Sequence, residues 1–172
     1  MKVYVIMGVA GCGKSTVGRE AAKRLNIPFL EGDHFHPKSN IKKMSRGTPL
    51  NDEDRMPWVE AMIQTCQGTA SKSDGKDAPM ILACSALSKT VRQRLREGLN
   101  ERCQFIHLQG AQAMIERRLS ERSGHFFKAD LLASQFAALD MPQRAITLDV
   151  FQPVDILAQQ VCDIIQSEDQ AE

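Results

Sequence analysis

The sequence has no excess of charge of either sign. Its 172 residues include 22 lysines and arginines and 21 aspartates and glutamates, which gives a formal net charge of +1 at pH 7. A balanced surface supplies no long-range field for nucleic acid or for an anionic membrane, so we expect neither partner. The sequence also has no run of about 20 apolar residues, the length that a membrane-spanning helix needs. We therefore expect a soluble protein.

The five cysteines form no paired pattern. They are scattered, odd in number and never spaced as C-x-x-C. This scattered arrangement argues against a disulfide framework or a structural zinc site, and it favours a reducing compartment. The short apolar stretch at residues 2–7 leads directly into a glycine-rich loop, whereas a secretory signal needs a longer apolar core and a cleavage site. These features predict a cytoplasmic location.

Apolar runs that suit buried strands alternate with helical patterns along the chain. The length fits one domain, residues 1–172, and the content of 42% hydrophobic and 25% charged residues is typical of globular proteins. Strands are predicted at residues 2–7, 27–33, 80–86, 103–110 and 144–150. Helices are predicted at residues 14–25, 38–46, 52–66, 89–99, 111–122, 131–139 and 154–166, with a polar surface loop at 67–79. This alternation predicts an α/β fold with a five-stranded parallel sheet and helices on both faces.

Residues 8–15, GVAGCGKS, match the phosphate-binding pattern G-x-x-x-x-G-K-[ST] in full. The three glycines let the backbone turn its N–H groups inward around phosphate oxygens, and the following helix adds its positive N-terminal end. Lys14 places a point charge on the β- and γ-phosphates, while the Ser15 hydroxyl is a ligand for Mg²⁺. The motif lies between an apolar strand and a helix, as this mechanism requires. The predicted nucleotide-binding residues here are Gly8, Gly11, Cys12, Gly13, Lys14, Ser15 and Thr16.

Two signatures of other P-loop proteins are missing. The third predicted strand, MILACSA, does not end in the aspartate through which many ATPases and GTPases hold Mg²⁺. The sequence also has no N-K-x-D guanine motif, and it is too short for a P-loop core with large motor insertions. These absences favour a compact phosphoryl transferase over a motor or a GTPase switch.

Asp33 is the candidate acid, within the stretch GDHFHP at residues 32–37. It follows the second predicted strand, at the edge of the sheet where α/β proteins bind ligands. A carboxylate there accepts a proton from an acceptor hydroxyl, orients it, or reaches Mg²⁺ through water. The alternative is a helix N-cap or turn aspartate. If the stretch is extended, His34 and His36 share the opposite face, and without a cysteine or third histidine they do not indicate a metal site.

Several motifs together resemble the gluconate kinases, small P-loop sugar-acid kinases related to shikimate and nucleoside-monophosphate kinases. The motifs are GVAGCGKS, GDHFHP followed by NIKKM, PLNDEDRMPW, CSAL, RLSERSGHFF and QFAALDMP, and they cover nearly the whole chain. The resemblance implies transfer of phosphate from ATP to D-gluconate, giving 6-phosphogluconate, with Mg²⁺ as cofactor in a cytoplasmic homodimer. It also implies an acceptor-binding helical segment at about residues 33–66 and a short lid at about residues 123–130.

The resemblance implies roles for individual residues as well. The implied catalytic residues are Lys14, Asp33 and Arg122. The implied nucleotide contacts beyond the P-loop are Arg118, Arg122 and Pro153. The implied acceptor contacts are Asp33, His36, Arg55 and Lys128. Arg55 is assigned to the substrate carboxylate because its planar fork matches a carboxylate bidentately; the alternative is an ion pair with Asp52 or Asp54.

Two aromatic or imidazole side chains are expected in the core. Trp58 is expected to pack the acceptor-side helix rather than stack on a sugar, and His107 is expected to be a buried histidine with its hydrogen bonds satisfied.

Departures from the family pattern are Ser88, Lys89 and Val91 after CSAL, and Asp140 in LDMP. Two alternative functions stay open: another small acceptor, such as shikimate or a nucleoside monophosphate, and a P-loop switch with negligible transfer activity.

Overall fold

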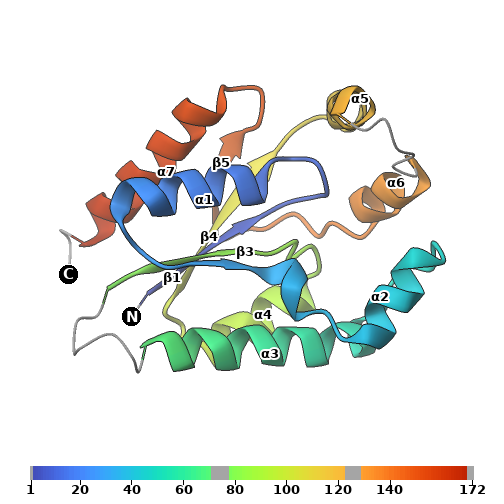
Figure 1. The fold of residues 1–172 in the computed structure, drawn as a ribbon, viewed down its shortest axis with the longest axis horizontal. Helices are drawn as coiled ribbons and strands as arrows, with labels where there is room; N and C mark the ends of the chain where they lie inside the picture. Colours follow the sequence, from blue (N-terminus) through green and yellow to red (C-terminus); the bar gives the residue numbers. More distant parts are fainter. Residues whose placement is uncertain (1, 71–77, 123–128, 170–172) are drawn as a thin grey trace.

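A five-stranded parallel sheet organises the chain (Figure 1). The computed structural model describes residues 2–70, 78–122 and 129–169. The strands lie in the order β2-β3-β1-β4-β5, and neighbouring strands are parallel throughout. Their bounds are β1 Val3–Met7, β2 Phe29–Glu31, β3 Met80–Ala83, β4 Cys103–Gln109 and β5 Ala145–Asp149. The predicted α/β fold with a five-stranded parallel sheet is confirmed.

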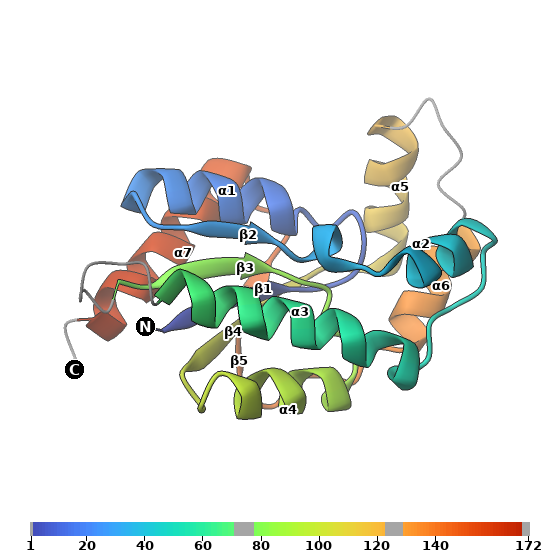
Figure 2. The same cartoon turned by 60° about the horizontal axis from the view of Figure 1, so that its bottom comes forward.

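Helices cover both faces of this sheet, so the molecule has three layers. Helices α1 and α7 pack together on one face, and α3 and α4 pack on the other (Figures 1 and 2). The bounds are α1 Lys14–Leu25, α2 Lys38–Ser45, α3 Asp52–Ala70, α4 Lys89–Gly98, α5 Gln112–Arg122, α6 Ala129–Ala137 and α7 Val154–Asp169. No helix among the described residues is long and apolar enough to span a bilayer.

Two apolar cores lie on either side of the sheet because its central strand is buried on both faces. All five residues of β1 are buried. Tyr4 and Ile6 pack with α1 and α7, whereas Val3, Val5 and Met7 pack with α3 and α4. Successive strand side chains point to opposite faces, so a continuous apolar strand serves both cores.

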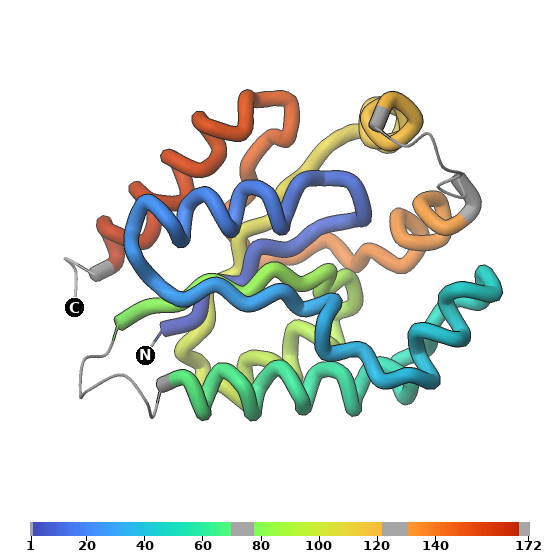
Figure 3. The backbone as a smooth tube through the Cα atoms, viewed as in Figure 1, coloured from blue at the N-terminus to red at the C-terminus, as the bar shows by residue number. Residues whose placement is uncertain are grey.

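The carboxyl ends of the strands gather the loops that concern function. The chain turns back between β1 and α1 at this edge, where α2, α5 and α6 also lie (Figure 3). In parallel α/β sheets, ligands bind outside the carboxyl ends of the strands. The fold therefore places the P-loop and the three short helices at one end of the molecule.

Two local predictions were wrong. The expected extended stretch at residues 32–35 is a 3₁₀ helix, η1 (Gly32–Phe35), so the argument that assigned its histidines to one strand face does not apply. Gly32 is buried against β3: a Cβ there would lie 2.5 Å from the carbonyl oxygen of Ala83. The expected loop from residue 67 begins later, because α3 continues to Ala70; Gln67 Nε2 donates to the Gly98 carbonyl at 2.8 Å and ties this last turn to the end of α4.

Candidate active site

A cavity of about 640 Å³ lies at the carboxyl edge of the sheet. The P-loop forms one wall, and η1, α2 and the start of α3 contribute another. The loop after β3 and one face of α6 complete it. The residues that line the cavity include Ala10, Lys14, Ser15, Asp33, His36, Arg55, Trp58, Ala86, Leu131, Ser134, Gln135 and Ala138.

The P-loop turns through backbone conformations of positive φ, which glycine adopts readily. Gly8 and Gly11 have φ of 143° and 79°, in the range that residues with a Cβ rarely adopt. A Cβ on Gly8 would also lie 2.8 Å from the Leu108 carbonyl oxygen. Helix α1 begins at Lys14, whose Nζ donates to the Val9 carbonyl at 3.0 Å. The strand, the glycine-rich loop and the helix N-terminus thus follow one another in the arrangement that the motif predicts.

The side chain of Cys12 faces the protein interior. It is buried and belongs to the core beneath the P-loop. In this arrangement Cys12 contributes only its backbone to the loop. The burial agrees with a small filler residue rather than with an accessible thiol at a helix N-terminus.

Asp33 and His36 reach the cavity from opposite ends of the turn that follows β2. The Asp33 side chain is exposed and has no hydrogen-bond or ion-pair partner among the described residues. The His36 ring stacks on Trp58, with centroids 4.4 Å apart and planes 9° from parallel. Burial lowers the pKa of His36; Arg55 lowers it further, and Asp33 opposes the shift. His36 is therefore neutral at pH 7, and its buried Nδ1 has no partner within the described part of the chain.

Trp58 anchors this turn to the core. Its side chain is 1% exposed, and Nε1 donates to the Gly32 carbonyl at 2.7 Å. Its packing against α4 and β3 confirms the expected core role. The stack with His36 extends that role to the cavity wall, because the rigid indole fixes the plane of the imidazole.

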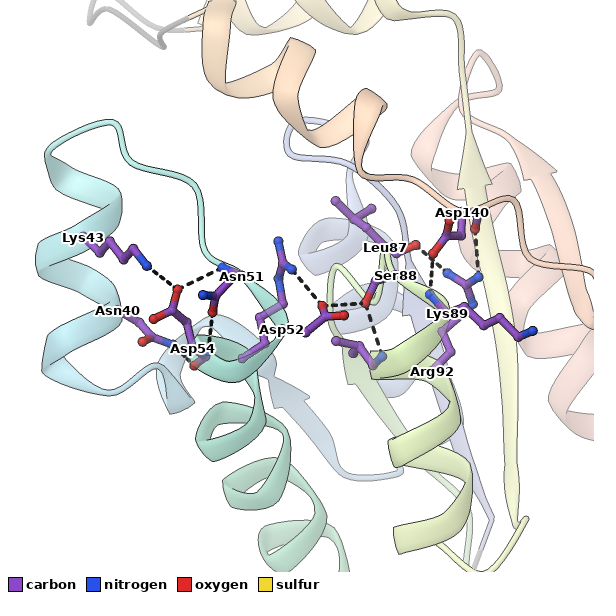
Figure 4. A network of polar contacts seen from close by, with 12 residues as sticks. Asn40, Lys43, Asn51, Asp52, Asp54, Leu87, Ser88, Lys89, Arg92 and Asp140 are labelled. Carbon is purple, nitrogen blue, oxygen red and sulfur yellow. Dashed lines mark hydrogen bonds and ion pairs between the residues drawn. The ribbon is translucent and has the colours of Figure 1, made fainter.

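Arg55 forms the ion pair with Asp52 that the sequence offered as the alternative, and it also faces the cavity. Its Nη1 donates to Asp52 Oδ1 at 3.0 Å, one helical turn earlier, and the residue also lines the cavity. The same Asp52 oxygen accepts from the Ser88 hydroxyl at 3.3 Å (Figure 4). Ser88 in turn caps α4 by accepting from Val91 N at 3.3 Å. Helix α3 is thus joined to the start of α4 beside the cavity.

A second cluster holds α2 against the start of α3. Asn51 and Asp54 form a reciprocal cap, with Asn51 Oδ1 accepting from Asp54 N at 2.8 Å and Asp54 Oδ2 accepting from Asn51 N at 2.9 Å. Lys43 donates to the same carboxylate, and Asn40 Nδ2 donates to the Asp54 carbonyl at 2.7 Å (Figure 4). The Lys43 hydrogen bond and the Asn51 N–H lower the pKa of Asp54. We call Asn40, Lys43, Asn51 and Asp54 the α2–α3 clasp.

Arg92 holds the loop that follows β3. Its guanidinium is buried, with the residue 4% exposed, and Nη1 donates to the carbonyls of Ala86 and Leu87 at 2.9 and 2.6 Å. Nη2 donates to the Asp140 carbonyl at 2.8 Å, and the Asp140 carboxylate accepts from Lys89 N at 2.8 Å (Figure 4). Ala86 has a left-handed φ of 44°, which these contacts support.

Arg118 and Pro153, which are predicted to contact the nucleotide, do not line the cavity. The Arg118 guanidinium sits over the Phe151 ring, 5.8 Å from its centroid, and Pro153 is exposed just before α7. Arg122 ends α5, but its side chain lies outside the described residues. Lys128 and most of the predicted lid also lie outside them.

His107 differs from its expectation in one respect. It is buried on β4, as predicted, but its Nδ1 has no hydrogen-bond partner among the described residues. Burial and the nearby Arg92 both lower the pKa of His107. The prediction of a fully satisfied core histidine was wrong at this atom.

A parallel sheet with a P-loop and an adjacent cavity at its carboxyl edge defines a P-loop nucleotide-binding fold. The family model for Shikimate kinase matches residues 10–137. The chain is 40% identical to the Thermoresistant gluconokinase of Escherichia coli (strain K12), over 95% of this chain and 93% of that protein. It is 36% identical to the Gluconokinase of Gluconobacter oxydans (strain 621H), over 98% and 93%. The chain therefore belongs to the shikimate kinase family and, within it, to the gluconokinases.

A solved structure agrees with this placement. The crystal structure of a gluconokinase from Sinorhizobium meliloti 1021 superimposes with a TM-score of 0.84 at 35% identity, covering 96% of this chain and 92% of that one. The resemblance to gluconate kinases that the motifs indicated is confirmed.

Proposed function

We propose that this protein transfers the γ-phosphoryl group of ATP to a hydroxyl of D-gluconate and releases 6-phosphogluconate and ADP. One observation carries the proposal beyond family membership. The P-loop and the side chains of Asp33, His36 and Arg55 line the same cavity, which at about 640 Å³ has the size of a small-ligand site. Phosphate donor and sugar-acid acceptor therefore bind in one space.

On the donor side, the inward N–H groups of the P-loop bind the phosphates, and Lys14 neutralises charge on the β- and γ-phosphates. Its ammonium group exchanges the Val9 carbonyl for phosphate oxygens when ATP binds. Mg²⁺ is bound in such sites through one or two protein oxygens together with phosphates, and it stabilises the charge that develops during transfer. The Ser15 hydroxyl, which lines the cavity, fits that donor set, with Asp33 available through water.

On the acceptor side, Asp33 accepts a hydrogen bond from the reacting hydroxyl and takes its proton as the phosphoryl group transfers. Its carboxylate is free for this task, as it has no partner among the described residues. Neutral His36 offers Nε2 to the sugar hydroxyls, since its Nδ1 is buried. Arg55 binds the gluconate carboxylate, and Asp52 orients its guanidinium.

The rest of the assignment follows the family. Arg118 and the loop carrying Pro153 contact adenine, Arg122 acts from the end of α5, and Lys128 contributes from the adjoining lid at about residues 123–130. Residues 33–66 form the acceptor-binding segment of a single domain spanning 1–172. The enzyme is a cytoplasmic homodimer that acts on a small molecule, without nucleic-acid or membrane partners.

An acceptor screen tests this function. ADP release from ATP and Mg²⁺ is followed with gluconate, shikimate, a nucleoside monophosphate or no acceptor. Gluconate-dependent release is the expected result. Release that depends on shikimate, the substrate in the matching family's name, would assign the acceptor pocket differently. Release independent of any acceptor would contradict a kinase function.

A further inference from the structure

Helix α6 reaches the P-loop through one side chain. Oε1 of Gln135 accepts a hydrogen bond from the backbone N–H of Ala10 at 2.6 Å, across a separation of 125 residues. Ala10 belongs to the loop whose N–H groups turn toward phosphate. A residue from the far side of the cavity therefore holds one of these donors.

The chemistry of this contact fixes the orientation of the Gln135 amide. A backbone N–H only donates, so the Gln135 atom that faces Ala10 is the oxygen. The Nε2 group carries two N–H donors and has no acceptor among the described residues. Gln135 lines the cavity with Leu131 and Ser134, which share one face of α6, and with Ala138 directly after the helix. Two unused donors are thus fixed at the cavity wall beside the P-loop.

The position of Gln135 in the cavity indicates which phosphate these donors address. The P-loop lysine reaches the β- and γ-phosphates. Here Lys14 Nζ bonds to the carbonyl of Val9, the residue directly before Ala10. The Val9 carbonyl and the Ala10 N–H belong to one trans peptide and point in opposite directions, so Lys14 and Gln135 hold this peptide from its two sides. Gln135 also lines the cavity that Asp33 and Arg55 line, and the γ-phosphate is the end of ATP that faces the acceptor.

We propose that Gln135 binds the γ-phosphate of ATP through Nε2 while its Oε1 holds the backbone of Ala10. The inference rests on the proposed kinase function and adds a residue that distinguishes ATP from ADP. An amide suits both tasks because it has an acceptor for the loop and donors for the phosphate. A carboxylate at this position would still accept the hydrogen bond from Ala10, but it would repel the γ-phosphate instead of donating to it.

Gln135→Glu separates the two tasks. Isothermal titration with ADP and with AMPPNP, a non-hydrolysable ATP analogue, is carried out with Mg²⁺ and without acceptor. We expect AMPPNP affinity to fall by about 10- to 100-fold and ADP affinity by less than about threefold, as for a lost hydrogen bond to a charged group. Retained ADP binding shows that the variant and its P-loop are folded. Gln64→Glu, an exposed glutamine on α3, is the matched control and should leave both affinities unchanged.

Two results would overturn the proposal. AMPPNP affinity equal to that of the wild type would mean that Nε2 does not contact the γ-phosphate. An equal loss for ADP and AMPPNP would mean that Gln135 only supports the loop. Because no acceptor is present, the titration gives its answer whether or not gluconate is the substrate. Failure of the proposed function is read separately, from gluconate-dependent ADP release by the wild-type protein.

Discussion

Arg55→Ala removes two interactions of very different size, an ion pair within α3 and the proposed contact with gluconate. The ion pair joins Arg55 and Asp52 at 3.0 Å, with side chains 23% and 45% exposed. Partly exposed pairs of this kind contribute about 0.2–1 kcal/mol. Asp52 also keeps the Ser88 hydroxyl at 3.3 Å, so its carboxylate is not left without a partner. We expect the melting temperature to fall by no more than about 4 °C.

The effect on catalysis should be much larger. Losing a charge-assisted, bidentate contact to a carboxylate costs about 2–4 kcal/mol, a decrease of about 30- to 1,000-fold in kcat/KM for gluconate. The decrease should appear mainly in KM for gluconate, with KM for ATP unchanged, in steady-state assays of ADP formation.

A matched control lies on α4. Arg94 pairs with Glu60, with Nη2 to Oε2 at 2.9 Å and similar exposure of 35% and 39%, but neither residue lines the cavity. Arg94→Ala should lower the melting temperature by a similar amount and leave both KM values unchanged. An unchanged KM for gluconate in Arg55→Ala, or an equal rise in KM for ATP, would refute the assignment of Arg55 to the substrate carboxylate.

Three further predictions concern the support of the cavity. Trp58→Phe loses the indole hydrogen bond to the turn after β2, and urea denaturation should show a loss of about 1–3 kcal/mol in the free energy of unfolding; an unchanged value would contradict the anchoring role. Lys43→Ala removes the side-chain partner of Asp54 in the α2–α3 clasp. It should raise KM for gluconate by a few-fold and not KM for ATP, and equal changes would show that α2 does not position the acceptor wall. Burial lowers the pKa of His36 and His107 below 6.5, so the unfolded chain binds more protons in the window below that value. The free energy of unfolding should therefore fall as the pH drops through 6.5, and it should fall less steeply in His107→Asn. Identical pH dependence in the wild type and in the variant would contradict a contribution from His107.

The layout of the fold was predictable because its signals are local. The pattern of Lys14–Leu25 gave the bounds of α1 as the structure has them, since small buried residues recur on one face after the glycine loop. The five strands were also placed within a few residues of their bounds. The signal is clearest for the central strands β1 and β3, because strands buried on both faces are continuously apolar. The end of α3 was misplaced because Gln67 and its neighbours are polar. Their helical conformation depends partly on a contact with Gly98 that no local pattern shows.

The cavity was only partly predictable because its supports come from distant segments. The turn at Gly32–Phe35 depends on Trp58, 26 residues after the glycine whose carbonyl it binds. The sequence offered Asp54 as a possible ion-pair partner of Arg55. In the structure the Asp54 carboxylate pairs with Lys43 instead. The N-x-x-D spacing of residues 51–54 was an available signal for this cap. The contact of Gln135 with Ala10 had no such signal, since it exists only once α6 packs over the P-loop.

The central claim is that Asp33, free at the cavity wall, acts on the acceptor hydroxyl opposite the P-loop. The most direct measurement is the initial rate of 6-phosphogluconate formation from ATP and gluconate by wild-type protein and by Asp33→Asn, followed by ³¹P NMR. The account predicts gluconate-dependent product from the wild type and a kcat at least about 100-fold lower in the variant, with KM for ATP unchanged. Turnover by Asp33→Asn within a few-fold of the wild type would contradict it.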